Sequence, residues 1–212
     1  GLHGDNQDGF TGGEYVKEDG TIIRWMIMLD GCGSGLRSKA GVDIALDFIE
    51  RKMPLYLEKT PVAEIPNQLI MYELVEYIEF FSIAAVLGLG EARRFLDGEF
   101  ELKDHPNWEA VNEHIRSFFL FTVFGLIQTD EDVIVFSRGD GSENVNGACR
   151  YFEQNNAPYY PAYFVIPWTV PKEVVSDRTM NQAVYDASSI GYVILGTDSW
   201  IRHKILFQAL PQ

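Results

Sequence analysis

The sequence predicts an α+β protein, and three observations lead to that class. An apolar, β-branched run of strand length near the N-terminus is followed by segments with helical periodicity. The second half of the chain holds several short apolar runs separated by turn residues. Connections of hairpin length outnumber the longer crossovers that join parallel strands. Layered antiparallel sheets with helices are therefore favoured over a doubly wound parallel sheet.

The first half of the chain is expected to be mostly helical. Residues 1–13 contain five glycines and predict a loop. Pro54 is expected to end the first helix, and Pro66 to lie in the first turn of the second. The expected elements are a strand at 21–29 that ends on Asp30, a helix at 38–53, a helix at 67–87, and a helix that begins at Pro106 and ends near Ser117.

The second half is expected to form strands. Residues 118–128 are too aromatic and β-branched to favour a helix. Residues 129–132 predict a turn before a strand at 133–136, and Asn146-Gly147 is typical of a two-residue hairpin. Two more strands are predicted at 163–166 and 192–195. No repeat or linker divides the sequence, so residues 1–212 are interpreted as a single domain.

Charge and composition exclude several classes of function. Seventeen basic against 31 acidic residues give a net charge of −14, which would repel nucleic-acid backbones and anionic membranes, although solubility alone also explains such a surface. The longest apolar stretches are about half the length of a membrane span. Cys32 and Cys149 form no disulfide framework, which predicts a reducing, cytoplasmic location. Because the chain begins with Gly1 rather than Met, a secretory leader removed from the N-terminus remains an alternative.

Aspartates follow three of the predicted strands. Asp30, Asp140 and Asp198 each lie beside small residues at a strand end, and Asp8 lies in the N-terminal loop. Carboxylates presented in this way are the hard oxygen ligands that Mg²⁺ and Mn²⁺ prefer. For any one of them the alternative is an ordinary Asp-Gly turn. Spacing alone does not bring them together.

Four motifs carry a resemblance to a known family. In chain order they are GLHGDNQD, DGCGSGLRSKAG, GDGSENVNG and ILGTDSW. Their order and spacing resemble the metal-dependent serine/threonine phosphatases of the protein phosphatase 2C type, particularly the bacterial forms, over residues 1–201. The resemblance implies a four-layer α-β-β-α sandwich in which two antiparallel sheets pack face to face and the metals lie at one end.

The resemblance also implies roles for individual residues. Asp30 would bridge two metal ions, with the Gly31 carbonyl beside it, and Asp198 would hold the first ion. Asp8 would act through water, and Asp140 corresponds to an aspartate that contacts a third ion in some bacterial members. The implied cofactors are two or three Mn²⁺ or Mg²⁺ ions.

Three departures from the family pattern affect this site. His3 stands where the family has a phosphate-binding arginine, so it is a candidate phosphate contact. The alternatives are that Arg37 contacts the phosphate instead, or that His3 is an incidental residue of the N-terminal loop. Ser199 replaces a glycine. No acidic residue follows Asp198. Either one metal site lacks a ligand, or the chain is incomplete at its C-terminal end, as we expect.

The implied activity is hydrolysis of phosphoserine or phosphothreonine in a protein substrate by a water that two cations share. No phosphoenzyme is needed, so Cys32 is interpreted as a packing residue. The main alternative is a weakly active or inactive phosphatase-fold module that binds phosphopeptides or regulates a partner. A nucleotide-binding loop is disfavoured because Leu36 stands where a glycine is needed and the P-loop lysine is absent.

Overall fold

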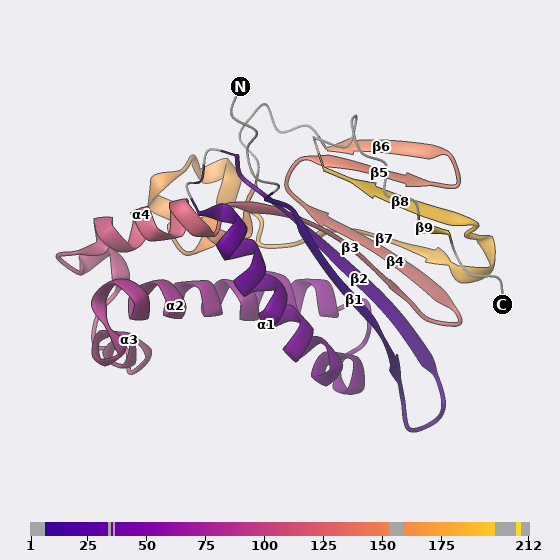
Figure 1. Ribbon diagram of the computed structural model, residues 1–212, viewed down its shortest axis with the longest axis horizontal. Coiled ribbons are helices and arrows are strands. Elements are labelled where there is room, and N and C mark those ends of the chain that lie inside the picture. The colour runs from indigo at the N-terminus through magenta and orange to yellow at the C-terminus, as the bar shows by residue number, and fades with distance from the viewer. Residues whose placement is uncertain (1–6, 34, 36, 153–158, 198–206, 209–212) are drawn as a thin grey trace.

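The computed structural model describes residues 7–33, 35, 37–152, 159–197 and the backbone of 207–208. These residues form two antiparallel sheets with helices stacked on one of them (Figure 1). The five-stranded sheet has the order β1-β2-β3-β4-β7, and the four-stranded sheet has the order β6-β5-β8-β9. The α+β class and the pair of antiparallel sheets are confirmed.

The strands are β1 Gly9–Val16, β2 Ile22–Gly31, β3 Phe121–Gln128, β4 Asp132–Arg138, β5 Gly141–Val145, β6 Ala148–Phe152, β7 Asn181–Asp186, β8 Tyr192–Gly196 and β9 Phe207–Gln208. The longer helices are α1 Ser38–Lys59, the π-helix η1 Pro66–Leu74, α2 Val75–Leu87, α3 Leu89–Leu96 and α4 Trp108–Phe118. The 3₁₀ turns are η2 Leu102–Asp104, η3 Pro161–Phe164, η4 Pro167–Thr169, η5 Lys172–Val175 and η6 Ala187–Ser189.

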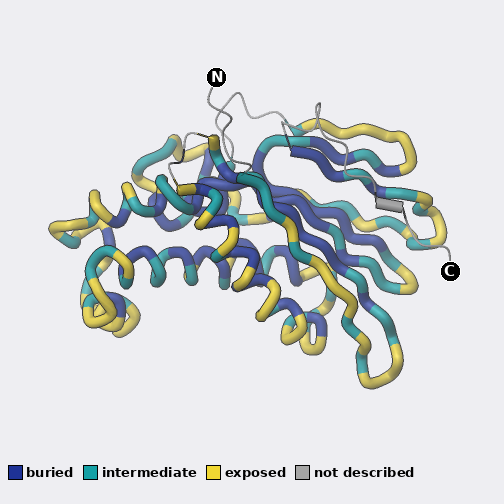
Figure 2. The backbone as a smooth tube through the Cα atoms, viewed as in Figure 1, coloured by how far each residue is buried: buried dark blue, intermediate teal, exposed yellow. Residues whose placement is uncertain are grey.

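Strand β2 shows how the layers are stacked. Its odd-numbered side chains, such as Ile27 and Leu29, join the cluster beneath the helices, whereas Met26 and Met28 join a second cluster against the four-stranded sheet. Because alternate side chains of a strand point to opposite faces, β2 is covered on both sides. Figure 2 shows the resulting band of buried backbone through the middle of the five-stranded sheet. The described residues thus form helix, sheet and sheet layers of the sandwich.

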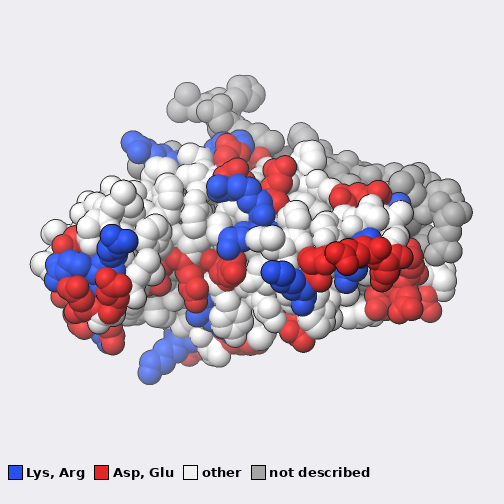
Figure 3. All heavy atoms as spheres, turned by 90° about the horizontal axis from the view of Figure 1, so that it is seen from below, with Lys and Arg blue, Asp and Glu red and all other residues white. Residues whose placement is uncertain are grey.

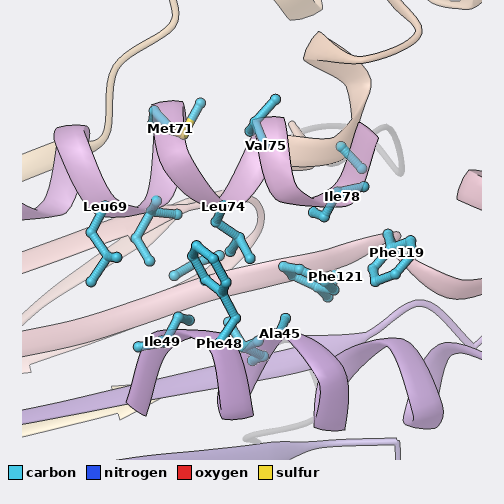
Figure 4. Close-up of a cluster of buried hydrophobic side chains, with 14 of the residues drawn as sticks. Ala45, Phe48, Ile49, Leu69, Met71, Leu74, Val75, Ile78, Phe119 and Phe121 are labelled. Atoms are coloured by element: carbon cyan, nitrogen blue, oxygen red, sulfur yellow. The ribbon is translucent and has the colours of Figure 1, made fainter. Parts of the chain in front are cut away.

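The larger cluster fills the space between the helices and the five-stranded sheet. Ala45 and Ile49 of α1 and Leu74 and Ile78 of the η1–α2 segment have no exposed surface. Figure 4 shows these side chains directed toward one another, with Phe121 of β3 among them. Burial on this scale holds the helices rigidly against the sheet whose ends carry the predicted site.

Several predicted elements are confirmed by the structure. The strand at 21–29 becomes β2, the second helix spans η1 and α2, and the third becomes α4. The Asn146-Gly147 turn joins β5 to β6, and both residues have positive φ (52° and 92°) as a tight hairpin requires.

Other predictions were wrong, each because packing outweighed a local preference. Residues 9–13 form part of β1 because β2 supplies their partners, and Gly9 lies so close to α1 that a Cβ there would be 2.6 Å from Leu46. Helix α1 continues through Pro54, since Met53 and Leu57 on either side are fully buried. Residues 163–166 form the end of the 3₁₀ turn η3 and the bend after it, packed against the larger core cluster, rather than a strand. The sequence reading also missed α3 and β7.

The surface mixes charges with an acidic excess. Figure 3 shows patches of Asp and Glu on one face with Lys and Arg among them. Partly exposed ion pairs in the described chain include Arg24 with Glu14 at 3.0 Å and Lys52 with Glu73 at 3.1 Å. Exposed pairs of this kind add little stability. Across the described ranges, no helix is both long and apolar enough to cross a membrane.

Candidate functional site

The strand pairing brings Asp8 and Asp30 to one end of the five-stranded sheet. Gly9 of β1 pairs with Leu29 of β2, so Asp8 and Asp30 each lie one residue beyond that pair on neighbouring chain segments. Both residues are half-buried. Asp30 follows Met28 by two residues and therefore lies on the face that packs against the four-stranded sheet.

The end of β3 lies beside Asp30. Asp30 pairs directly with Thr122, and residues opposite each other in an antiparallel pair point to the same face. Thr122 is 4% exposed. Its Oγ1 has no hydrogen-bond partner within the described part of the chain.

A hydrogen-bond network joins the N-terminal segment to the loop after β2. Gly31 lies against Gln7, and a Cβ at Gly31 would be 3.0 Å from the Gln7 carbonyl oxygen. With the Gln7 amide oriented to satisfy its neighbours, Nε2 donates to the carbonyl oxygens of Cys32 (2.8 Å) and Gly31 (3.2 Å) and to Ser38 Oγ (2.6 Å). The buried Ser38 hydroxyl in turn lies 3.0 Å from the Cys32 carbonyl oxygen. Gln7 and Ser38 therefore hold the backbone next to Asp30.

Asp140 lies in the joint between the two sheets. Gly139 has φ 107° and Gly141 has φ 149°, so both adopt backbone conformations that favour glycine. A Cβ at Gly139 would be 2.5 Å from Thr122, and one at Gly141 would be 2.4 Å from Phe124. The turn that carries Asp140 is therefore pressed against β3, at the same sheet end as Asp30.

Tyr160 connects the two aspartate loops. Burial, a hydrogen bond with Cys32 and the negative charge of Asp140 raise the pKa of the Tyr160 phenol. Tyr160 is 7% exposed. Its hydroxyl therefore lies beside the loop that follows Asp30 and within electrostatic reach of Asp140. Cys32 packs there, as expected from the sequence.

The described residues include only part of the predicted metal site. Asp8, Asp30, Gly31 and Asp140 lie at one end of the five-stranded sheet, which their spacing alone did not predict, and their role as metal ligands stays a prediction. No group of three or more His, Cys, Asp or Glu side chains within the described ranges is arranged to hold a metal ion. Asp198, His3 and Ser199 lie outside those ranges, although Gly196 at the end of β8 pairs with Ser142 close to Asp140.

The donor types nevertheless suit a hard divalent cation. Two carboxylates and the Gly31 carbonyl, on adjoining segments, offer oxygen atoms only. Close approach of Asp8 and Asp30 would otherwise be opposed by like charge.

The remaining predicted groups have structural partners. Arg37 lies over the Phe118 ring, with its guanidinium 5.5 Å from the ring centroid. His114 Nδ1 is 3.2 Å from Ser82 Oγ, its ring stacks on Phe118, and burial lowers its pKa. His105 accepts a hydrogen bond from the Asn107 amide. These two histidines are therefore packing residues, and His203 lies outside the described residues.

Sequence reasoning missed three residues around this site. Thr122, Arg138 and Tyr160 lie next to the aspartates only through strand pairing and loop packing. The position of Arg138 immediately before Gly139-Asp140 was the one signal available in the sequence.

Comparison with known proteins gives the following. No protein-family model and no curated protein matches the chain. Similar solved structures include the serine/threonine phosphatase Stp1 of Staphylococcus aureus, with 11% identity, a TM-score of 0.47, and coverage of 94% of this chain and 73% of that one. A serine/threonine phosphatase of S. agalactiae has 12% identity, a TM-score of 0.42, and coverage of 94% and 76%. These values assign neither a family nor an activity to the present chain.

Proposed function

We propose that this chain is a Mn²⁺- or Mg²⁺-dependent phosphatase acting on phosphoserine or phosphothreonine in a protein substrate in the cytoplasm. The observation that carries the proposal is the meeting of the motif residues Asp8, Asp30 and Gly31 at one sheet end, with the Asp140 turn packed against Thr122 beside them. Separate motifs that only the fold brings together indicate a shared site.

The residues of the chain divide the work of such a site. Asp30 and the Gly31 carbonyl would hold two cations together with Asp198, Asp8 would act through water, and Asp140 would contribute to a third. When bound, the cations would supply a lower pKa for water and positive charge opposite the phosphoryl oxygens. Gln7 and Ser38 orient the Gly31–Cys32 backbone. His3 is the proposed donor to the substrate phosphate.

One observation favours a second candidate, a non-catalytic module that binds phosphopeptides or regulates a partner. It is the presence of His3 and Ser199 where the family that the motifs resemble has an arginine and a glycine. In this case the same sheet end would recognise a phosphate group without hydrolysing it.

The test compares the protein with Asp30→Asn in p-nitrophenyl phosphate hydrolysis with and without added Mn²⁺. Asp30→Asn is expected to lower Mn²⁺-dependent turnover by about 100-fold or more, because a bridging carboxylate would be lost. Asp130→Asn is the matched control, since this exposed aspartate follows the opposite end of β3. It is expected to retain full activity.

Two outcomes would contradict the proposal. Turnover that is absent from the full-length protein with Mn²⁺ and with Mg²⁺ excludes the enzyme, and calorimetric titration with Mn²⁺ and a phosphopeptide then tests the binding module. Turnover that survives in Asp30→Asn shows that the site has been placed wrongly.

A further inference from the structure

Arg138, the last residue of β4, is a buried cation that the proposed chemistry does not use. It is 5% exposed. Its guanidinium donates to the carbonyl oxygens of Tyr159 (3.2 Å), Thr179 (2.8 Å) and Val174 (3.3 Å). One side chain therefore binds the start, the later part and the end of the segment 159–179.

The cost of burying Arg138 indicates that its contacts are specific. Within the described ranges no carboxylate lies at ion-pair distance from it, and burial lowers its pKa, with Asp177 opposing this effect from further away. The rings of Tyr159 and Phe164 lie under the guanidinium at 5.5 and 5.3 Å. A buried charge needs several good partners, and the planar fork of arginine suits three carbonyl groups at once.

The same residue lies two positions before Asp140. Arg138 pairs with Val123, the last β3–β4 pair at this end of the sheet, and Gly139 follows it directly. The turn is fixed on one side by its close contact with Thr122. On its C-terminal side Gly141 begins β5, which pairs with β6 and β8, and on its N-terminal side Arg138 binds the segment 159–179.

That segment also touches the loop after Asp30. Tyr160 follows Tyr159, whose carbonyl oxygen accepts a hydrogen bond from Arg138. The Tyr160 side chain forms a hydrogen bond with Cys32 and lies within electrostatic reach of Asp140. The segment thus contacts the loop after Asp30 and lies within electrostatic reach of Asp140, and Arg138 is the side chain that links it to the end of β4.

We propose that Arg138 is a positioning residue that sets the Asp140 turn by clamping the segment 159–179 beside it. The role of Asp140 in metal binding rests on the proposed function. The clamp itself is a property of the metal-free protein. Without Arg138, the segment 159–179 would lose its link to the end of β4, and the N-terminal side of the Asp140 turn would be less restrained.

The test uses Arg138→Met and Arg138→Lys, with Arg178→Met as the matched control. Arg178 donates to the Met71 carbonyl at 2.7 Å and lies over the rings of Tyr72 and Phe164, so it links the same segment to the π-helix η1 rather than to β4. Hydrogen exchange is measured on the metal-free proteins, Mn²⁺ binding by calorimetry, and kcat and KM with p-nitrophenyl phosphate.

Arg138→Met is expected to speed exchange at residues 139–142 by about tenfold or more, since three hydrogen bonds to a charged group are lost. Its weakest Mn²⁺ site should bind Mn²⁺ less tightly. In p-nitrophenyl phosphate hydrolysis, kcat should fall by a larger factor than KM rises. Arg138→Lys should rescue part of both effects because it keeps the charge but not the fork. Arg178→Met should speed exchange near residue 178 only.

Two results would overturn the clamp. In the first, residues 139–142 exchange at the parent rate in Arg138→Met, or in Arg138→Lys if the methionine variant does not fold. In the second, Arg178→Met changes residues 139–142 and Mn²⁺ affinity equally, which shows a general structural role. If the parent neither binds Mn²⁺ nor turns over substrate, the proposed function fails, while the exchange measurement still decides the clamp.

Discussion

Asp30 and Thr122 lie directly opposite each other where β2 and β3 meet, on the face between the two sheets. The carboxylate is half-buried, and the Thr122 hydroxyl is buried with no partner in the described part of the chain. A polar pair at the end of an otherwise apolar layer marks the point where the core gives way to the candidate site. It also leads to a prediction about stability.

Thr122→Val is expected to raise the free energy of unfolding of the metal-free protein by about 1 kcal/mol, because an unpaired buried hydroxyl is replaced by a methyl group of the same shape. Urea denaturation measures the change. Ser137→Ala is the comparison, since Ser137 Oγ is also buried and unpartnered among the described residues. A loss of stability in Thr122→Val would show that the hydroxyl has a partner that stabilises the fold.

Gly41→Ala is expected to destabilise the protein severely, by about 3 kcal/mol or more, through overpacking. A Cβ at Gly41 of α1 would lie 1.8 Å from the Phe118 carbonyl oxygen, so α1 and the end of α4 would have to separate. Gly90 in α3 has nothing within 4 Å of an added Cβ. Gly90→Ala should therefore stabilise by about 0.5 to 1 kcal/mol through helix propensity. Thermal unfolding of both variants checks this, and similar effects from the two would contradict the packing.

Glu79 is expected to make stability depend on pH. Burial raises its pKa from 4.5 to about 7, with Arg178 opposing and Glu76 adding to the shift. Between these values the folded state binds more protons than the unfolded state, so stability falls as pH rises through this window. Glu79→Gln should be more stable than the parent by about 1 to 3 kcal/mol above pH 7 and nearly equal to it below pH 4.5.

The measurement for Glu79 is denaturant unfolding at pH values from about 4 to about 8. This range extends beyond the unfolded and the folded pKa by about one pH unit or less. Glu131→Gln, a change at an exposed turn carboxylate, serves as the control and should follow the parent at every pH. A constant difference between Glu79→Gln and the parent would show that the carboxyl group titrates normally.

Local chemistry in the sequence was enough to predict some elements. The Asn146-Gly147 hairpin forms because both residues accept positive φ, and β2 forms from an apolar run long enough to be buried on both faces. The aspartates beside small residues at strand ends likewise indicated where Asp30 and Asp140 lie. In these cases the deciding interactions are between residues close in the chain.

Tertiary structure decided what depends on distant partners. Residues 9–13 form a strand because β2 lies beside them. Helix α1 continues past Pro54 because its residues Met53 and Leu57 are buried in the core. The surroundings of the candidate site follow the same rule. The sequence by itself determined the α+β class and the positions of the aspartates relative to the short apolar runs, since both are properties of short segments. Only the packed sheets placed Thr122 beside Asp30 and fixed Arg138 to the segment 159–179, because those contacts join residues far apart in the chain.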